Sequence, residues 1–236
     1  MSNRPSKRFL FRILRRDINL YSNVDSIVID AACNNGRSRP MFPSKNYIGI
    51  DMSKDELKAC MANYKDVTAV YADLTDTSLP ESSVDLCVTT NTLEWMSKDG
   101  QILAVKSMAS AVKSNGVYLL NKHRDDAFLP ILDILHDYFD KVEVIYYRNP
   151  LSKYYENFIS KNGHIITEGA MVGKLARLLL SYLMSYCEWL TTWVPAINEA
   201  AYIRCSNKKS TGIETDIYAS LKAENGIFVF NSAVNE

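Results

Sequence analysis

Three aspartates each follow a short apolar run in the first third of the chain: Asp30, Asp51 and Asp73. Asp51 comes 21 positions after Asp30. An acid at the end of a second strand can accept hydrogen bonds from both hydroxyls of a ribose, and an acid just past a third strand can accept one from an adenine amino group. The spacing therefore favours an adenosine ligand. The alternatives are that Asp51 or Ser53 caps the next helix and that Asp73 is an ordinary turn acid.

The turn after Asp30 is built from small and polar residues, Ala31-Ala32-Cys33-Asn34-Asn35-Gly36. It follows a buried strand, and ligands of a doubly wound sheet bind outside the carboxyl ends of the strands. Small residues let the backbone amides of such a turn approach a ligand closely. Because the turn lacks a GxGxxG run, it does not identify that ligand by itself.

Segments with strand character alternate with segments of helical periodicity through most of the chain. Strands are expected at residues 26–30, 47–51, 67–71, 84–89, 116–121, 142–147 and 200–205, and helices at 54–64, 101–112 and 128–138. This alternation predicts a mainly parallel α/β sheet that is covered by helices on both faces. Gly116 is expected to end the helix at 101–112 as a left-handed C-cap.

The chain divides into a basic N-terminal helix at residues 1–20, a main domain at 21–206 and a C-terminal tail at 207–236. The first sixteen residues contain six arginines and lysines and no acid, and their apolar residues recur at helical spacing. Three interpretations of this helix stay open: a cover helix packed on the domain, a helix on an anionic membrane surface, and a mitochondrial targeting segment.

Residues 148–198 are predicted to be a helical, aromatic-rich insertion before the last strand of the domain. Their most apolar part, residues 173–194, is interrupted by Lys174, Arg177 and Glu188, which argues against a bilayer-spanning helix. We expect this helix to pack on the domain or to line the substrate site, with membrane-surface contact as the second interpretation. One more edge strand is expected in the tail, at residues 227–230.

Composition excludes several classes of function. Basic and acidic residues both number 27, so the net charge is zero, which argues against a nucleic-acid partner. The five cysteines are scattered without paired spacing, which argues against disulfides or a metal site and suits a reducing compartment. The N-terminus lacks the long apolar region of a signal peptide. We therefore expect a cytoplasmic protein, either free or peripheral to the membrane.

Six short motifs occur in order, and together they resemble the successive motifs of class I S-adenosylmethionine-dependent methyltransferases. They are Asp30 to Gly36, Tyr47-Ile48-Gly49-Ile50-Asp51, Tyr71-Ala72-Asp73, Leu79-Pro80-Glu81-Ser82-Ser83-Val84-Asp85-Leu86, Asn91-Thr92-Leu93-Glu94-Trp95 and Lys113-Ser114-Asn115-Gly116. The resemblance covers roughly residues 24–121, and more loosely the strands as far as Cys205. It implies a doubly wound, mainly parallel, Rossmann-like sheet of seven strands, the last of them antiparallel.

The resemblance also implies S-adenosylmethionine as the cofactor. Its amino-acid part would be held by Asp30 and by Ala32, Cys33, Asn34 and Gly36 of the turn. Asp51 would bind the ribose with Met52 against the adenine, Asp73 and Leu74 would flank the adenine, and Asn91 would line the site near the methionine moiety. The family turn usually has glycines where this chain has Ala32 and Asn34. Asparagine tolerates left-handed backbone angles, whereas Ala32 adds a methyl group close to the expected cofactor.

Methyl transfer from a sulfonium is an in-line displacement, so the protein mainly binds, aligns and desolvates the reactants. A hydroxyl acceptor also needs a general base. His123, at the end of the fifth strand, is placed for that role, with Asp125 to orient it; the alternative is a solvated polar loop. We expect O-methylation of a small-molecule, glycan or lipid-linked acceptor. The alternative function is a catalytically silent binding or scaffold protein, and the oligomeric state is left open.

Overall fold

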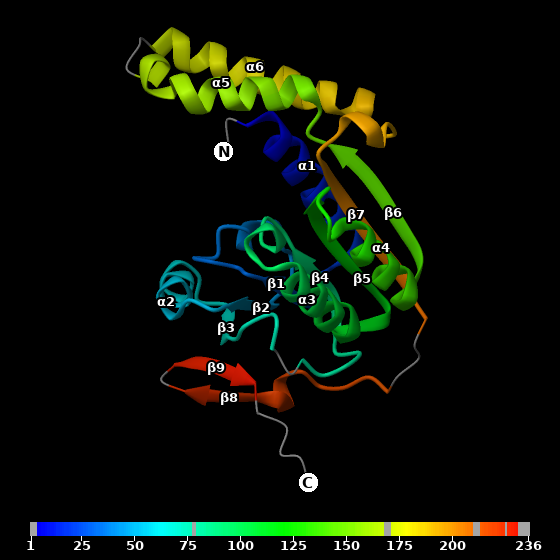
Figure 1. Ribbon diagram of the computed structural model, residues 1–236. Helices are drawn as coiled ribbons and strands as arrows, with labels where there is room; N and C mark the ends of the chain where they lie inside the picture. Colours follow the sequence, from blue (N-terminus) through cyan, green and yellow to red (C-terminus); the bar gives the residue numbers. More distant parts are fainter. Residues whose placement is uncertain (1–3, 77–78, 168–170, 210–212, 225, 231–236) are drawn as a thin grey trace. The chain divides into compact units, whose positions relative to one another are not determined.

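The computed structural model describes residues 4–76, 79–167, 171–209, 213–224 and 226–230 (Figure 1). The chain forms two compact units. Unit 1 contains Met1–Arg16 and Val144–Tyr202, and unit 2 contains Asp17–Glu143 and Ile203–Glu236. All the residues predicted to bind a cofactor or to act in catalysis belong to unit 2.

Nine strands among the described residues form one sheet, in the order β6-β7-β5-β4-β1-β2-β3-β9-β8. Their bounds are β1 Ile27–Ala31, β2 Asn46–Asp51, β3 Val67–Tyr71, β4 Val84–Thr89, β5 Val112–His123, β6 Phe139–Tyr147, β7 Ala200–Lys208, β8 Leu221–Glu224 and β9 Ile227–Phe230. β1 pairs in parallel with both β2 and β4, β2 with β3, and β4 with β5. The prediction of a mainly parallel Rossmann-like sheet is confirmed.

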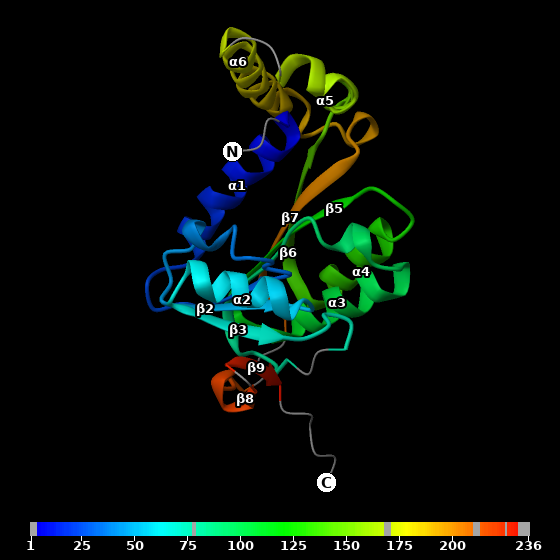
Figure 2. The same cartoon turned by 90° about the vertical axis from the view of Figure 1, so that its left-hand side faces the viewer.

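The prediction of seven strands is wrong, because the tail adds two. β9 lies parallel to β3, with Val70 opposite Phe228, and β8 pairs antiparallel with β9. Both views place this hairpin beside β3 (Figure 1, Figure 2). Ile227 is buried in a cluster with Leu57 and Ala69. β9 coincides with the edge strand that the sequence predicts at residues 227–230, whereas β8 is not among the predicted strands. The hairpin covers an otherwise exposed edge of β3.

Three helices pack in unit 2: α2 (Lys54–Asn63), α3 (Lys98–Ala111) and α4 (Phe128–Tyr138), with α3 and α4 side by side (Figure 1, Figure 2). The Ser53 and Ser97 hydroxyls cap α2 and α3 by accepting hydrogen bonds from the backbone amides of Glu56 and Gly100. Because the cap of α2 is Ser53, the Asp51 carboxylate before it is available for other contacts.

Gly116 does not cap a helix, contrary to the prediction, because α3 ends before Val112 and Gly116 lies within β5. Its φ is not positive. A Cβ atom at Gly116 would lie 2.8 Å from Val112 Cγ1, 2.9 Å from the Asp85 carbonyl oxygen and 3.0 Å from that of Val84. The glycine permits a close approach of β5 to β4 where the pairing of these strands shifts register.

Unit 1 contains the first part of α1 (Pro5–Tyr21) with α5 (Pro150–Thr167), α6 (Met171–Cys187) and the short 3-10 turns η3 (Glu188–Thr191) and η4 (Pro195–Ile197). The α1 side chains Phe9, Leu10, Ile13 and Leu14 are buried. Phe9 stacks on Tyr147 and packs edge-on against Trp189, with ring centroids 5.9 and 5.1 Å apart. The apolar face of α1 is therefore packed within the protein, as the cover-helix interpretation expects. No helix in the described part of the chain has the length and apolar character needed to cross a membrane.

Candidate cofactor site

The predicted site residues follow the carboxyl ends of neighbouring strands in the middle of the sheet. β1 lies between β2 and β4, so Asp30 is opposite Gly49 on one side and Val88 on the other. From β1 the chain continues to β2 and β3 on one side of β1, and it then crosses to β4 on the other side. The strand order therefore reverses beside β1. This reversal is the place where open α/β sheets bind ligands.

The turn after β1 has the backbone of a glycine turn although most of its residues are not glycine. Ala32, Asn34 and Gly36 have φ angles of 60°, 49° and 78°, all in the left-handed region. The turn is held by the Cys33 amide, which donates to the Ile50 carbonyl at 2.9 Å, and by the Asn34 side-chain amide, which donates to the Ala32 carbonyl at 3.0 Å. Alanine in this conformation costs about 1–2 kcal/mol, so the surrounding contacts impose it.

Cys33 and Gly36 hold the turn against the elements behind it. The Cys33 side chain is buried with Leu57 and Ala69, and a Cβ atom at Gly49 would lie 2.8 Å from its Sγ. A Cβ atom at Gly36 would lie 2.6 Å from Cys60 Sγ on α2. The Cys33 thiol therefore belongs to the core, and Gly36 is needed both for its φ and for its close approach to α2.

The Asp51 carboxylate joins the turn after β1 to the turn after β2. Its Oδ2 accepts from the Asn34 amide and its Oδ1 from the Ser53 amide, both at 2.9 Å, and the residue is buried. A carboxylate offers about four lone-pair positions, so each oxygen keeps capacity for one more donor. That arrangement suits a pair of vicinal hydroxyls, as the sequence predicts for a ribose.

Asp30 is buried below the turn and accepts a hydrogen bond from the Tyr47 hydroxyl at 2.6 Å. Burial raises the pKa of Asp30 to about 7, and the nearby Asp51 charge adds to this, while the Tyr47 hydrogen bond acts in the opposite direction. Tyr47 was not predicted as a site residue, because its part depends on the pairing of β2 with β1. A carboxyl group with this pKa is sensitive to a cation placed beside it.

The residues expected around an adenine differ in exposure. Leu74 is buried, Asp73 is exposed, and Met52 has 69% of its surface exposed. Asp73 Oδ1 accepts hydrogen bonds from both the amide and the hydroxyl of Thr75, each at 2.8 Å. Thr75 therefore fixes the orientation of the Asp73 carboxylate just past β3.

Asn91 follows β4 in a left-handed conformation, with a φ of 54°, and its amide donates to Asn121 Oδ1 of β5 at 2.8 Å. Glu94, three residues on in the short turn η2 (Leu93–Trp95), has a buried Oε2 atom for which the described residues provide no hydrogen-bond partner. Asn121 and Glu94 were missed as site residues. The acid in the Asn91-Thr92-Leu93-Glu94 run was the available signal for Glu94.

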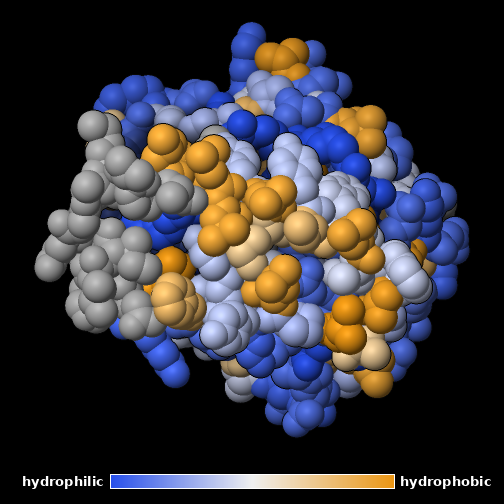
Figure 3. Space-filling view, turned by 90° about the horizontal axis from the view of Figure 1, so that it is seen from above, coloured by the Kyte–Doolittle hydropathy of each residue, from blue (hydrophilic) through white to orange (hydrophobic). Residues whose placement is uncertain are grey.

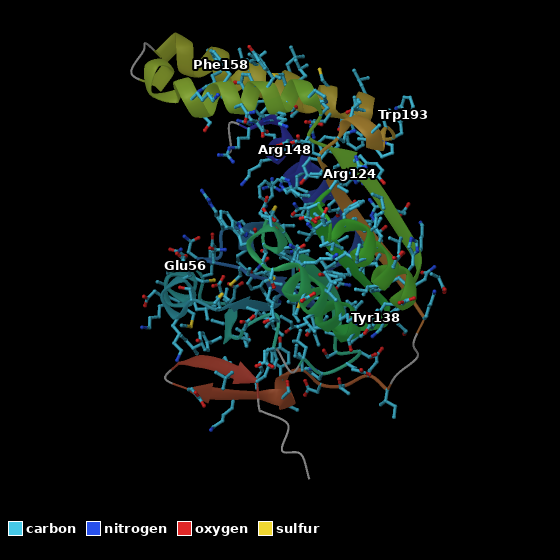
Figure 4. The ribbon with its side chains drawn as sticks, in the orientation of Figure 1. Glu56, Arg124, Tyr138, Arg148, Phe158 and Trp193 are labelled. Atoms are coloured by element: carbon cyan, nitrogen blue, oxygen red, sulfur yellow. The ribbon has the colours of Figure 1, made fainter. Side chains whose placement is uncertain are left out.

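His123 is the last residue of β5 and is half-buried, and Arg124, which follows it, is labelled in Figure 4. The Asp125 carboxylate has two partners: Oδ1 accepts from the Ala127 amide at 3.0 Å, and Oδ2 pairs with the ammonium group of Lys122. Lys122 is fully buried and was not predicted. The structure thus gives Asp125 a structural role in the loop, and its action on His123 stays a prediction.

The sequence from the middle of β1 to the end of β5 matches a known domain family. Residues 29–120 match the family model of a methyltransferase domain. A comparison with curated proteins finds no match. Among the described residues, no group of three or more His, Cys, Asp or Glu side chains is arranged to hold a metal ion.

Solved structures with a similar fold include a TehB-like SAM-dependent methyltransferase from Corynebacterium glutamicum. It is 14% identical with a TM-score of 0.55, and the alignment covers 86% of this chain and 98% of that one. The [4+2]-cyclase SpnF is 12% identical with a TM-score of 0.51 and coverages of 82% and 80%. Haemonchus contortus phosphoethanolamine N-methyltransferase 2, in complex with S-adenosyl-L-methionine, is 13% identical with a TM-score of 0.52 and coverages of 85% and 52%. Likeness at these identities shows the fold alone.

Proposed function

We propose that the chain binds S-adenosylmethionine and transfers its methyl group to an acceptor. The premise is that residues 29–120 form a methyltransferase domain of the class I S-adenosylmethionine-dependent superfamily. The observation that carries the proposal is the Asp51 carboxylate. It is tied to the amides of Asn34 and Ser53 and keeps acceptor capacity on both oxygens. The left-handed turn beside it has the backbone that the family obtains with glycines.

The predicted site residues offer a partner for each part of this cofactor. Asp51 would accept from the ribose hydroxyls, with Met52, Asp73 and Leu74 around the adenine. Asp30 and the turn residues Ala32, Cys33, Asn34 and Gly36 would hold the amino-acid part, and the ammonium group beside Asp30 would favour the ionised form of its buried carboxyl. Asn91, fixed by Asn121, would lie near the methionine moiety. The cofactor supplies an electrophilic methyl group, and the side chains bind it and exclude water.

For the acceptor, we propose O-methylation of a small-molecule, glycan or lipid-linked hydroxyl. His123 is the last residue of β5, which is parallel to β4 and β1, so it lies at the same carboxyl end of the sheet as Asp30, and it is half-buried. It would accept the proton that the acceptor hydroxyl loses on methylation. Asp125 would then stabilise the protonated imidazole while keeping its partner Lys122. We place the reaction in a reducing compartment, since all five cysteines are free.

A second candidate function is a methyltransferase-like binding protein without activity. The observation that favours it is Ala32, whose methyl group stands at a left-handed turn position that the family fills with glycine. The similar fold of the [4+2]-cyclase SpnF illustrates that this architecture is not restricted to methyl transfer.

Calorimetric titration with S-adenosylmethionine and S-adenosylhomocysteine separates these functions. Asp51→Asn keeps one oxygen but presents an amide group to a backbone N–H, so the affinity should fall by about 1–3 kcal/mol. Asp133→Asn on α4, which changes an exposed acid in the same way, is the matched control and should leave the affinity unchanged.

Each outcome of the titration decides between the candidates. Binding of both compounds that Asp51→Asn weakens supports the proposed cofactor site. Binding that Asp51→Asn does not alter would show that the ribose lies elsewhere. No binding to either compound at millimolar concentration would refute the proposed methyltransferase activity and leave the second candidate function, a binding protein without activity.

A further inference from the structure

Helix α6 is turned with its leucines outward. Exposed apolar residues recur every three or four positions along α6, the turn η3 that continues it and the residues just after η3. They are Leu175, Leu179, Leu183, Tyr186, Leu190 and Trp193, and we name them the leucine face. Leu183 and Leu190 have 63% and 72% of their surface exposed. Figure 3 shows hydrophobic residues gathered on the side of unit 1 that carries α5 and α6. An ordinary surface helix points such a stripe at the core.

The buried side of the same helix and of η3 is mainly polar instead. Ser181, Met184, Ser185 and Glu188 are all buried. Arg12 of α1 donates to the Ser185 carbonyl at 2.8 Å and to its hydroxyl at 3.2 Å. The Glu188 carboxylate accepts from the backbone amides of Arg148 and Asn149 at the start of α5, at 2.9 and 3.3 Å.

These contacts fix the rotation of α6. Rotating α6 so that the leucine face points inward would break the hydrogen bonds of Ser185 and Glu188, and no equivalent polar contacts would replace them. An apolar stripe that specific polar contacts hold outward, on a protein that must otherwise avoid large exposed apolar patches, indicates a binding surface.

Charge identifies the kind of surface that this face meets. Unit 1 contains eleven lysines and arginines and four acids, a net charge of +7, whereas the rest of the chain carries 16 and 23, a net charge of −7. Two of the four acids, Glu156 and Glu188, are buried. The guanidinium groups of Arg8 and Arg12 lie over the rings of Tyr182 and Tyr186, 4.1 and 4.0 Å from the centroids. Arg8 is itself buried, whereas the half-buried Arg12 lies over Tyr186 at the border of the leucine face.

We propose that the leucine face binds the surface of an anionic lipid bilayer, with α6 lying in the plane of the interface. Leucines on one side, tryptophan and tyrosine at the margin and basic residues nearby are the features of helices that lie at such an interface. A second copy that pairs face to face through the leucine face is a poorer partner, because two units of charge +7 would repel each other. The proposal rests on unit 1 alone and is independent of the methyltransferase activity.

Flotation with lipid vesicles tests the proposal on the full chain. The double variant Leu183→Glu/Leu190→Glu changes two exposed residues, and Leu129→Glu on α4, where the leucine is 69% exposed, is the matched control. Wild type and control should float with vesicles that contain phosphatidylglycerol and much less with phosphatidylcholine alone. The double variant should lose at least tenfold in its partition coefficient, since burying one leucine is worth about tenfold or more. Added salt should also weaken binding.

Two results would overturn the proposal. One is partitioning of the double variant equal to that of the control. The other is a wild type that does not bind anionic vesicles but is dimeric by light scattering, together with a double variant that is monomeric. That result would assign the leucine face to a second copy. Circular dichroism of each variant checks that it is folded, and a folded double variant is expected because both leucines are exposed.

Tryptophan fluorescence gives a second measurement that needs no variant of the leucine face. The chain contains three tryptophans, and Trp95→Phe leaves Trp189 and Trp193, both in unit 1. Trp193, labelled in Figure 4, is 77% exposed. Anionic vesicles should shift the emission of this variant to the blue, and lipids brominated near the head group should quench it. Unchanged emission at saturating lipid would contradict the proposed orientation.

Discussion

Protonation of Asp30 should make the stability of this protein depend on pH in an unusual direction. The pKa of Asp30 is raised from 3.8 to about 7, first by burial and further by the nearby Asp51. Since each pKa unit is worth about 1.4 kcal/mol, the difference between the folded and unfolded chains corresponds to about 4 kcal/mol. Asp30 has only 3% of its surface exposed, so solvent screens this effect little.

The sign follows from which state binds the proton. Between pH 3.8 and about 7, the folded chain keeps the Asp30 proton and the unfolded chain has lost it. The contribution to the free energy of unfolding is therefore fully present below pH 3.8, falls as the pH rises, and is lost above about pH 7. Aspartates held in ion pairs, whose pKa is lowered, act in the opposite direction.

Urea unfolding of the wild type and of Asp30→Asn across this pH window measures the effect. Asparagine keeps an oxygen for the Tyr47 hydroxyl but does not titrate. From about pH 4 to about pH 7, the wild type should lose up to about 4 kcal/mol relative to Asp30→Asn. Tyr47→Phe removes the hydrogen bond that lowers the pKa of Asp30, so its loss of stability should occur at higher pH than in wild type. Parallel pH profiles for wild type and Asp30→Asn would refute the reasoning.

Two further predictions concern backbone positions. Ala32→Gly removes a left-handed backbone strain of about 1–2 kcal/mol, but it also stabilises the unfolded state by about 0.5–1 kcal/mol of chain entropy. The variant should therefore raise the melting temperature slightly. The control Ala31→Gly, within β1, should lower it. A lower melting temperature for Ala32→Gly would contradict the assigned conformation. Gly116→Ala should destabilise the protein by about 1–3 kcal/mol in urea unfolding, because its Cβ would lie 2.8 Å from Val112 Cγ1. Wild-type stability for that variant would contradict the close approach of β5 to β4.

Much of unit 2 follows from local patterns in the sequence. β3, β4 and α4 begin and end at the residues that the periodicity predicts, because each is a short apolar or amphipathic run with clear boundaries. The left-handed conformation of Asn34 was anticipated from its residue type, and Ser53 from its place before α2. These are properties of one residue and its near neighbours, which a sequence displays directly.

Positions that depend on a partner strand or loop were not predictable in the same way. Gly116 was assigned to a helix end, whereas its requirement for glycine comes from the backbone of β4 across the sheet. β9 lies where the sequence predicts an edge strand, but its pairing with β3 and the added strand β8 depend on the open edge of the sheet. Tyr47 and Lys122 enter the site region only through contacts with Asp30 and Asp125. Sequence spacing does not encode such contacts, since they join residues through the fold.

The sequence alone therefore determined the order of strands and helices and the placing of Asp30, Asp51 and Asp73 at strand ends, because strand and helix periodicities are local. Only the tertiary structure decided how those aspartates are used: Asp51 ties two turns together, and Asp30 is buried deeply enough to hold its proton near neutral pH. It also decided which side of α6 faces outward. The helical pattern alone predicts leucines turned to the core, but the contacts of Arg12 and Glu188 hold the opposite side inward.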